Sequence, residues 1–193
     1  HFHTKTPRFK GAQDFTGASV KSIARYSSIN QERTGHIDLE LGGKKWAYLA
    51  SLTRSSFGDL RMGLNRVHGF DDFGLVRQYA QRINGKDSAV INADPSVQIG
   101  TAYGQYDVLQ KVRYKASQNF DLIWNTQYST STNIGRFDRL NDTLNGTPKY
   151  AEWYYGPQRR LLTSLKGVLS NQSGFFNKAS FIVAFQDIDE DRI

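Results

Sequence analysis

Three consecutive aromatic side chains form the part of the sequence best suited to hold a flat ligand. Trp153, Tyr154 and Tyr155 stand directly before Gly156 and Pro157, a combination that predicts a loop. Aromatic rings are costly to expose in a loop and can stack on a planar molecule. We therefore take the three aromatics as ligand-binding candidates. The alternative is that they pack the loop against its neighbours.

Positively charged side chains lie on both sides of the aromatic run and could attract an anionic ligand. They are Arg136, Arg139, Arg159 and Arg160. The competing interpretation is that they pair with carboxylates of the same loop, such as Asp138 and Glu152. Arg136 and Arg139 are kept as ligand-binding candidates beside that interpretation.

Two histidines could act as metal ligands, including axial ligands of a haem iron. His36 alternates with Asp38 and Glu40, so it is expected on the polar face of a strand. His68 lies in a long connection. Solvated or hydrogen-bonded imidazole rings are the alternative, and the sequence does not identify a metal.

The sequence carries no motif for catalysis. There is no G-x-S-x-G, no phosphate-binding glycine loop and no H-E-x-x-H, and cysteine is absent. The net charge is +7, but basic and acidic residues are mixed along the chain. The sequence therefore lacks the clustered basic face that nucleic-acid binding needs. We expect a protein that is not an enzyme, requires no cofactor and binds no nucleic acid.

The elements that must position these residues are β-strands. Apolar and polar residues alternate with period two, and helical periodicity is nearly absent. The alternation predicts strands at about 18–29, 35–41, 46–53, 106–116, 120–130, 159–170 and 175–186. The predicted fold class is all-β, with antiparallel strands.

The connections between these strands are of two kinds. Short turns are predicted near 42–45, 117–119 and 171–174, and long connections at about 58–104 and 131–157. Outer-membrane β-barrels have short periplasmic turns and long extracellular loops, whereas a soluble β-sandwich usually has shorter connections.

Aromatic residues follow each short turn on the apolar side of the next strand. These are Trp46, Phe120 and Phe175, the positions where a barrel carries an aromatic girdle. Tyr128 lies eight residues beyond Phe120. In a tilted strand this spacing covers roughly 19 Å along the membrane normal, close to the height of the apolar band.

Positive charges alternate along the opposite side of the strand at 106–116. Lys111, Arg113 and Lys115 would each cost several kcal/mol if buried unpaired in a dry core. They are therefore expected to face a water-filled lumen. The solvent face of a sandwich would also accept them, so a soluble β-sandwich module that binds carbohydrate or protein is the alternative.

Seven strands leave two open edges, whereas a barrel in lipid must close with about eight strands or more. The bare start, and the segment 187–193, which we expect to begin another loop, favour a part of a larger barrel.

A set of short motifs runs in order through most of the chain. They are 3–7 (HTKTP), 25–28 (RYSS), 34–38 (TGHID), 42–47 (GGKKWA), 58–63 (GDLRMG), 109–113 (LQKVR), 136–140 (RFDRL) and 151–158 (AEWYYGPQ). Together they resemble the barrel domain of TonB-dependent receptors, especially the haem/haemoglobin-receptor-like branch of Bacteroidetes. The resemblance implies a transmembrane barrel of about 22 strands closed by an N-terminal plug.

The same resemblance implies a location in the bacterial outer membrane, with extracellular loops and periplasmic turns. It also implies energised import of a scarce nutrient, such as haem or a ferric siderophore. Expected partners are membrane lipid, that nutrient, a TonB complex acting through an N-terminal region, and a surface lipoprotein. Residues 1–193 would be a partial barrel domain, without plug, TonB box or the later haem-receptor signature. Lys111, Arg113 and Lys115 would then face acidic groups of the plug.

Overall fold

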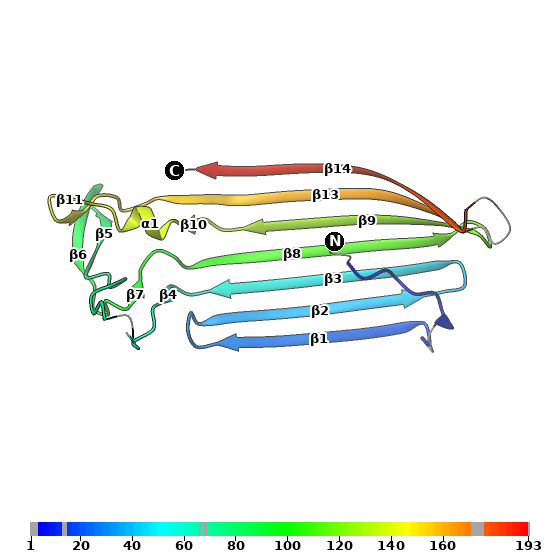
Figure 1. The fold of residues 1–193 in the computed structure, drawn as a ribbon, viewed down its shortest axis with the longest axis horizontal. Helices are drawn as coiled ribbons and strands as arrows, with labels where there is room; N and C mark the ends of the chain where they lie inside the picture. Colours follow the sequence, from blue (N-terminus) through cyan, green and yellow to red (C-terminus); the bar gives the residue numbers. More distant parts are fainter. Residues whose placement is uncertain (1–3, 13–14, 66, 68, 171–175, 193) are drawn as a thin grey trace.

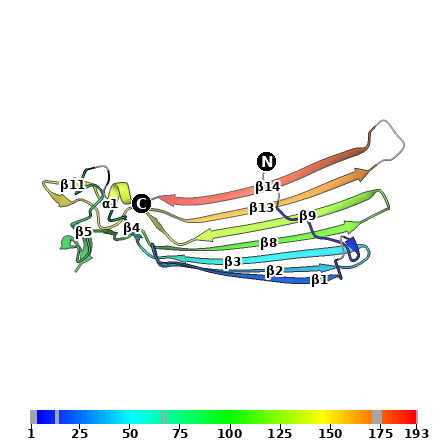
Figure 2. The same cartoon turned by 60° about the horizontal axis from the view of Figure 1, so that its bottom comes forward.

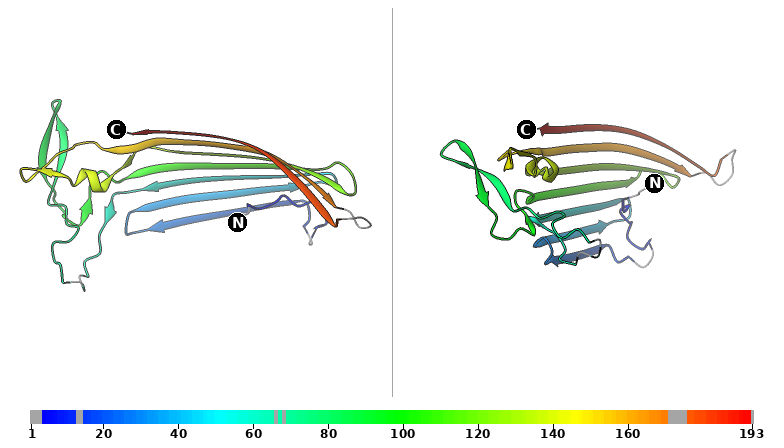
Figure 3. Two further views of the ribbon diagram at one scale, coloured as in Figure 1. Left: turned by 45° about the horizontal axis from the view of Figure 1, so that its top comes forward. Right: turned by 60° about the vertical axis from the view of Figure 1, so that its left-hand side comes forward.

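The computed structural model describes residues 4–12, 15–65, 67, 69–170 and 176–192 as an almost entirely β-stranded chain (Figure 1). One antiparallel sheet dominates, in the order β1-β2-β3-β8-β9-β13, with β14 beside β13. Its long strands are β1 (Ala18–Ser27), β2 (Glu32–Gly42), β3 (Trp46–Phe57), β8 (Tyr103–Lys115), β9 (Phe120–Ser131), β13 (Tyr154–Ser170) and β14 (Lys178–Arg192). The sheet is curved, and among the described strands β1 and β14 form its two edges (Figures 2 and 3).

All seven predicted strands are present, and the all-β, antiparallel class is confirmed. Two expectations about the ends of strands were wrong. The segment from Asp187 continues β14 as far as Arg192 instead of beginning a loop. Its polar residues lack an apolar alternation, but they lie opposite polar residues of β13, where Arg159 pairs with Asp189 at 3.0 Å. Tyr154 and Tyr155 also begin β13, although a loop was expected there.

Cross-strand register gives the sheet two chemically different faces. Residues directly opposite one another share a face, and neighbours along a strand alternate. We call the first the apolar face; one row across it is Leu41, Tyr48, Val112, Trp124, Leu165 and Val183. We call the second the polar face; the adjacent row there is Glu40, Leu49, Lys111, Asn125, Ser164 and Ala184. One row of the apolar face has a polar centre, namely Gln110, Thr126 and Thr163.

The apolar face is largely exposed. Trp46 is 58% exposed, Trp124 52% and Phe185 60%. Buried apolar side chains are instead few, and two of them, Ala47 and Leu49, belong to the polar face of β3. The described chain therefore has a thin core on one side of the sheet and an uncovered apolar surface on the other.

The N-terminal segment, residues 4–12 and 15–17, lies against the polar face near the short turns (Figure 1). Its backbone is tied to the β2–β3 turn, because Lys10 N donates to Gly43 O at 3.1 Å and Gly42 N donates to Gly17 O at 2.7 Å. Pro7 and Phe15 are buried there. This segment covers Leu49 and its neighbours, so the small core lies between it and the sheet.

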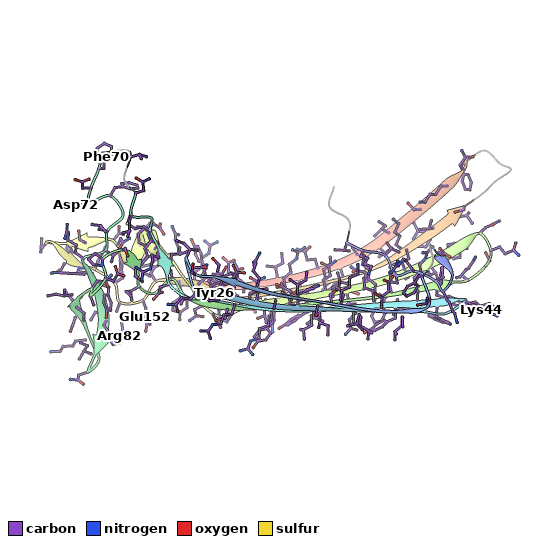
Figure 4. The ribbon with its side chains drawn as sticks, turned by 90° about the horizontal axis from the view of Figure 1, so that it is seen from below. Tyr26, Lys44, Phe70, Asp72, Arg82 and Glu152 are labelled. Carbon is purple, nitrogen blue, oxygen red and sulfur yellow. The ribbon has the colours of Figure 1, made fainter. Side chains whose placement is uncertain are left out.

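Two of the predicted short turns lie at one end of the sheet, and the two long connections, which we call the excursions, lie at the other end. Figure 4 places Lys44, in the β2–β3 turn, at one end, and Tyr26, near the end of β1, toward the other. The β8–β9 turn lies at the same end as Lys44. The described residues of 58–102, the first excursion, and residues 132–153, the second excursion, extend beyond the other end (Figure 1). The predicted separation of turns from long connections is confirmed for these segments, while the β1–β2 turn is a short turn at the end of the excursions.

The excursions are themselves folded. They contain β4 (Leu60–Arg61), β5 (Gln78–Ile83), β6 (Lys86–Ile91), β7 (Val97–Gln98), β10 (Ile134–Gly135), α1 (Phe137–Leu140), β11 (Thr143–Leu144) and β12 (Thr147–Pro148). The β5–β6 hairpin turns at Asn84 and Gly85, both at positive φ, which is the geometry of a tight type I′ turn. Asp59 closes the base of the first excursion, since its carboxylate accepts hydrogen bonds from the backbone N–H groups of Thr101 and Ala102.

We predict that Gly42→Ala loosens the N-terminal segment from the sheet. A Cβ at Gly42 would lie 2.4 Å from Arg8 O and 2.7 Å from a ring carbon of Phe15. Overpacking of this kind costs about 1–3 kcal/mol, so amide exchange within residues 4–12 should accelerate by about tenfold or more. Hydrogen exchange with mass spectrometry measures the rate. Gly43→Ala is the control, because its Cβ would meet only Trp46 O at 3.4 Å; equal rates in the two variants would contradict the packing argument.

Candidate functional site

Glu40 is the most enclosed charged group of the sheet, with a side chain that is 1% exposed. Its carboxylate accepts the ammonium of Lys5 at 2.7 Å and the guanidinium of Arg8 at 2.8 Å. The backbone N–H of Arg8 donates to the same carboxylate at 2.9 Å. Two cations and one amide therefore satisfy this buried anion, and all three belong to the N-terminal segment.

Lys111 and Arg113 hold the same segment from β8. Lys111 Nζ donates to Thr4 O at 3.1 Å, and Arg113 donates to Pro7 O at 3.4 Å. The guanidinium of Arg113 also lies 4.5 Å from the centre of the Phe9 ring, a cation–π distance. Both side chains face the polar side, as the alternation predicts.

The predicted acidic partners of these cations are not in the N-terminal segment. Lys111 and Arg113 contact its backbone carbonyl groups, and Arg113 also pairs with Asp121 of β9. The segment itself supplies cations to Glu40. Lys115 lies at the turn end of β8, and its ammonium makes no ion pair within the described part of the chain. Whether any of the three faces a plug stays a prediction.

His36 lies on the polar face, where the alternation places it. Its Nδ1 lies 2.7 Å from Thr53 Oγ1, and its Nε2 lies 3.1 Å from Asp38 Oδ1. Both ring nitrogens thus have protein partners, which is the hydrogen-bonded alternative to metal ligation. The ring lines a cavity of about 570 Å³ on the polar face. His68 lies outside the described residues.

Arg136 connects the second excursion to the start of β13. Its guanidinium donates to the carboxylate of Asp138 and to the hydroxyl of Tyr155, and lies 5.0 Å from the centre of the Tyr155 ring. The hydrogen bond to Asp138 raises the pKa of Arg136, and the same bond lowers the pKa of Asp138. Pairing with Asp138, the alternative weighed for this arginine, is present.

Arg139 pairs with Asp142 at 3.2 Å instead of with Glu152. Its guanidinium lies 5.4 Å from the centre of the Trp153 ring, and Tyr150 meets the same indole edge-on at 4.6 Å. Trp153 therefore packs within its own excursion. The structure brings together Arg136 with Tyr155 and Arg139 with Trp153, while Tyr154 pairs in register with Gly135 of β10.

The two excursions pack against each other and line an open cavity of about 840 Å³. Its apolar lining includes Leu75, Val76, Phe137 and Leu140. Elsewhere in the contact, the backbone N–H of Ala151 donates to the carboxylate of Asp87. Sequence reasoning missed this cavity, because its walls come from segments about sixty residues apart and neither segment has a strong period. The nearby hairpin residue Arg82 and the loop residue Glu152 are labelled in Figure 4.

No group of three or more His, Cys, Asp or Glu side chains in the described residues is arranged to hold a metal ion. No helix among them is long and apolar enough to cross a membrane. In comparisons with known proteins, no family model, no curated protein and no solved structure matches this chain.

We predict that Glu40→Gln destabilises the fold by about 2–3 kcal/mol, because it removes the charge that two cations of the N-terminal segment share. Urea unfolding of the intact polypeptide, followed by tryptophan fluorescence, measures the change. Asp189→Asn is the matched control, since Asp189 and Arg159 are both more than half exposed, and such pairs contribute less than about 1 kcal/mol. A similar small loss in both variants would show that the segment is held by other contacts.

We predict that Arg136→Gln returns the pKa of Asp138 upward, toward its ordinary value. The hydrogen bond from Arg136 is the largest cause of the lowered pKa. A lowered pKa in the folded state means that the interaction stabilises the fold above the unfolded pKa of Asp138 and is lost as the pH falls through the folded one. Carboxyl-carbon NMR titration measures the pKa. An unchanged pKa in the variant would exclude Arg136 as its cause.

Proposed function

We propose that this chain is one arc of an outer-membrane β-barrel, and that the whole protein is a TonB-dependent receptor. The observation that carries the proposal is the exposed apolar face, which extends from β2 through β3, β8, β9 and β13 to β14. A continuous apolar surface of this kind needs a cover of protein or lipid. The described chain supplies a cover only for the opposite, polar face.

Strand length supports the same proposal. The seven long strands have 10 to 17 residues. Strands of globular proteins have about 5–6 residues, whereas a strand that crosses a bilayer needs about 9–11. On the apolar face, the rows that cross β9 between Phe120 and Tyr128 are largely apolar. In a tilted strand these eight residues cover roughly 19 Å along the membrane normal, which is close to the height of the apolar band of a barrel.

The polar face supports a water-filled interior. It carries Glu40, Lys111 and Arg113, and the N-terminal segment lies on it instead of on the apolar face. In a receptor of the proposed class the segment would lie inside the barrel. The folded excursions would be extracellular and the short turns periplasmic.

A soluble β-sandwich module for carbohydrate or protein is less well supported. A sandwich would pack its second sheet on the apolar face, about 10 Å away. In the described residues, no such sheet covers that face.

The proposed activity is energised import of a scarce nutrient such as haem or a ferric siderophore. The proposed partners are lipid, the nutrient, a TonB complex and a surface lipoprotein. The ligand-binding candidates of the second excursion and the start of β13 would lie on the extracellular side, where the nutrient arrives; they are Trp153, Tyr155, Arg136 and Arg139. The test is growth of the source bacterium on haem or a ferric siderophore as its only iron source, with and without the gene. Unimpaired growth on each would sink the proposal of iron import, and a polypeptide found outside the outer-membrane fraction would sink the barrel.

We predict that Val183→Arg costs about 2–4 kcal/mol in the membrane-embedded protein. Val183 is 68% exposed and lies in the row of Trp124, midway between the rows of Phe120 and Tyr128, where arginine would enter the bilayer centre. Ala184→Arg, its neighbour on the polar face, is the control and should change little. Urea unfolding in lipid vesicles measures both. In a soluble protein both exposed positions would tolerate arginine within about 0.5 kcal/mol, so equal, small effects would contradict the proposal.

A further inference from the structure

Five side chains lie opposite one another across the polar face and form one wall of a cavity. They are His36, Thr53, Asp107, Ser129 and Arg160, from β2, β3, β8, β9 and β13 in that order. We call this set the polar row. All five line the cavity of about 570 Å³, a volume within the range of small-molecule sites.

Four members of the polar row have partners within the sheet. His36 and Thr53 bind each other, and the carboxylate of Asp107 accepts the hydroxyl of Ser129 at 2.6 Å and the side-chain amide of Gln105 at 3.0 Å. These contacts fix the orientation of the hydroxyl and imidazole groups before any ligand arrives. The wall of the cavity is therefore preorganised, apart from one residue.

That residue is Arg160, whose guanidinium has no hydrogen bond or ion pair in the described part of the chain. The contrast with the preceding residue is direct, because Arg159 faces the other side of the sheet and pairs with Asp189 at 3.0 Å. An unpaired guanidinium presents a planar set of N–H donors that matches a carboxylate or a phosphate.

We propose that this cavity binds a polyhydroxylated oxyanion, such as a uronic acid or a sugar phosphate. The oxyanion pairs with Arg160, and the ligand hydroxyl groups exchange hydrogen bonds with side chains such as Ser129, Thr53 and Gln105, which can donate and accept. A flat apolar ligand would leave the guanidinium of Arg160 without a partner when it displaced water, which disfavours its binding.

This inference does not rest on the proposed function. The cavity lies within one sheet, and its chemistry is the same whether the apolar face contacts lipid or protein. It also differs from the loop site, because none of the loop candidates around Trp153 lines it.

The test is isothermal titration calorimetry on the intact native polypeptide with three probes. Digalacturonate supplies carboxylates, its methyl diester keeps the hydroxyl groups without the charge, and glucose 6-phosphate supplies a phosphate. We expect one or both oxyanions to bind. If digalacturonate binds, its methyl diester should bind at least about tenfold more weakly. Binding of glucose 6-phosphate alone would identify phosphate as the oxyanion; binding of digalacturonate alone would identify carboxylate.

Two adjacent variants locate the site. Arg160→Gln should weaken oxyanion binding by about tenfold or more, while Arg159→Gln should stay within about twofold of the wild type. Arg160→Lys keeps the charge without the planar donors. Its affinity for the oxyanion should lie between those of the wild type and Arg160→Gln. Both arginines are exposed on the same strand, so neither change removes a buried group.

The proposal is overturned if neither oxyanion binds, if the methyl diester binds as tightly as the tighter-binding oxyanion, or if Arg159→Gln weakens binding as much as Arg160→Gln. These outcomes are independent of membrane location. An oxyanion-binding polypeptide that fractionates as a soluble protein would remove the barrel proposal and keep this one. A membrane barrel that binds none of the probes would remove the oxyanion proposal and keep the barrel proposal.

Discussion

Backbone pairing in a fixed register is the constraint on which the rest of the structure depends. Once β2 and β3 pair so that Leu41 lies opposite Tyr48, every second residue of each long strand is committed to one face. A shift by one residue would exchange the two faces of a strand. The alternation in the sequence therefore has one consistent arrangement, in which apolar side chains form one face and polar side chains the other. An apolar surface of this extent requires a cover, and its chemistry is the main support for the membrane proposal.

The polar face has its own organisation, set by charge. Glu40 would be a costly buried anion if it were alone, and Lys5 and Arg8 make it tolerable by approaching from the N-terminal segment. Lys111 holds the same segment from β8 through a backbone carbonyl group. The segment and the sheet are thus joined by interactions that water could also satisfy. The segment does not line the neighbouring cavity that contains Arg160.

The sequence predicted the parts of the fold that depend on period two. The strands around Trp46, Lys111 and Trp124 and their polar and apolar sides are present, because each alternation is local and strong. The polar half of β14 was missed, since its pairing with Arg159 depends on a strand about thirty residues away. Arg160 lay within the predicted strand, but nothing local distinguished it from the ion-paired Arg159.

The candidate site was predicted only in part, for a related reason. The pairing of Arg136 with Asp138 could be weighed from the sequence because the two residues are close together. The packing of the two excursions depends on tertiary contacts. Neither the cavity between the excursions nor the polar row is marked by a short sequence motif. Tyr155 was placed in a loop because Gly156 and Pro157 follow it, yet pairing with β10 extends the strand to this point.

The central claim is that the apolar face contacts lipid, and quenching of tryptophan fluorescence by brominated lipid tests it most directly. Variants of the intact polypeptide that each keep a single tryptophan, at position 46, 124 or 153, would be reconstituted into bilayers. Trp46 and Trp124 lie on the apolar face, whereas Trp153 packs within an excursion. The account predicts strong quenching of Trp46 and Trp124, and little quenching of Trp153. Equal, weak quenching at all three positions would contradict it.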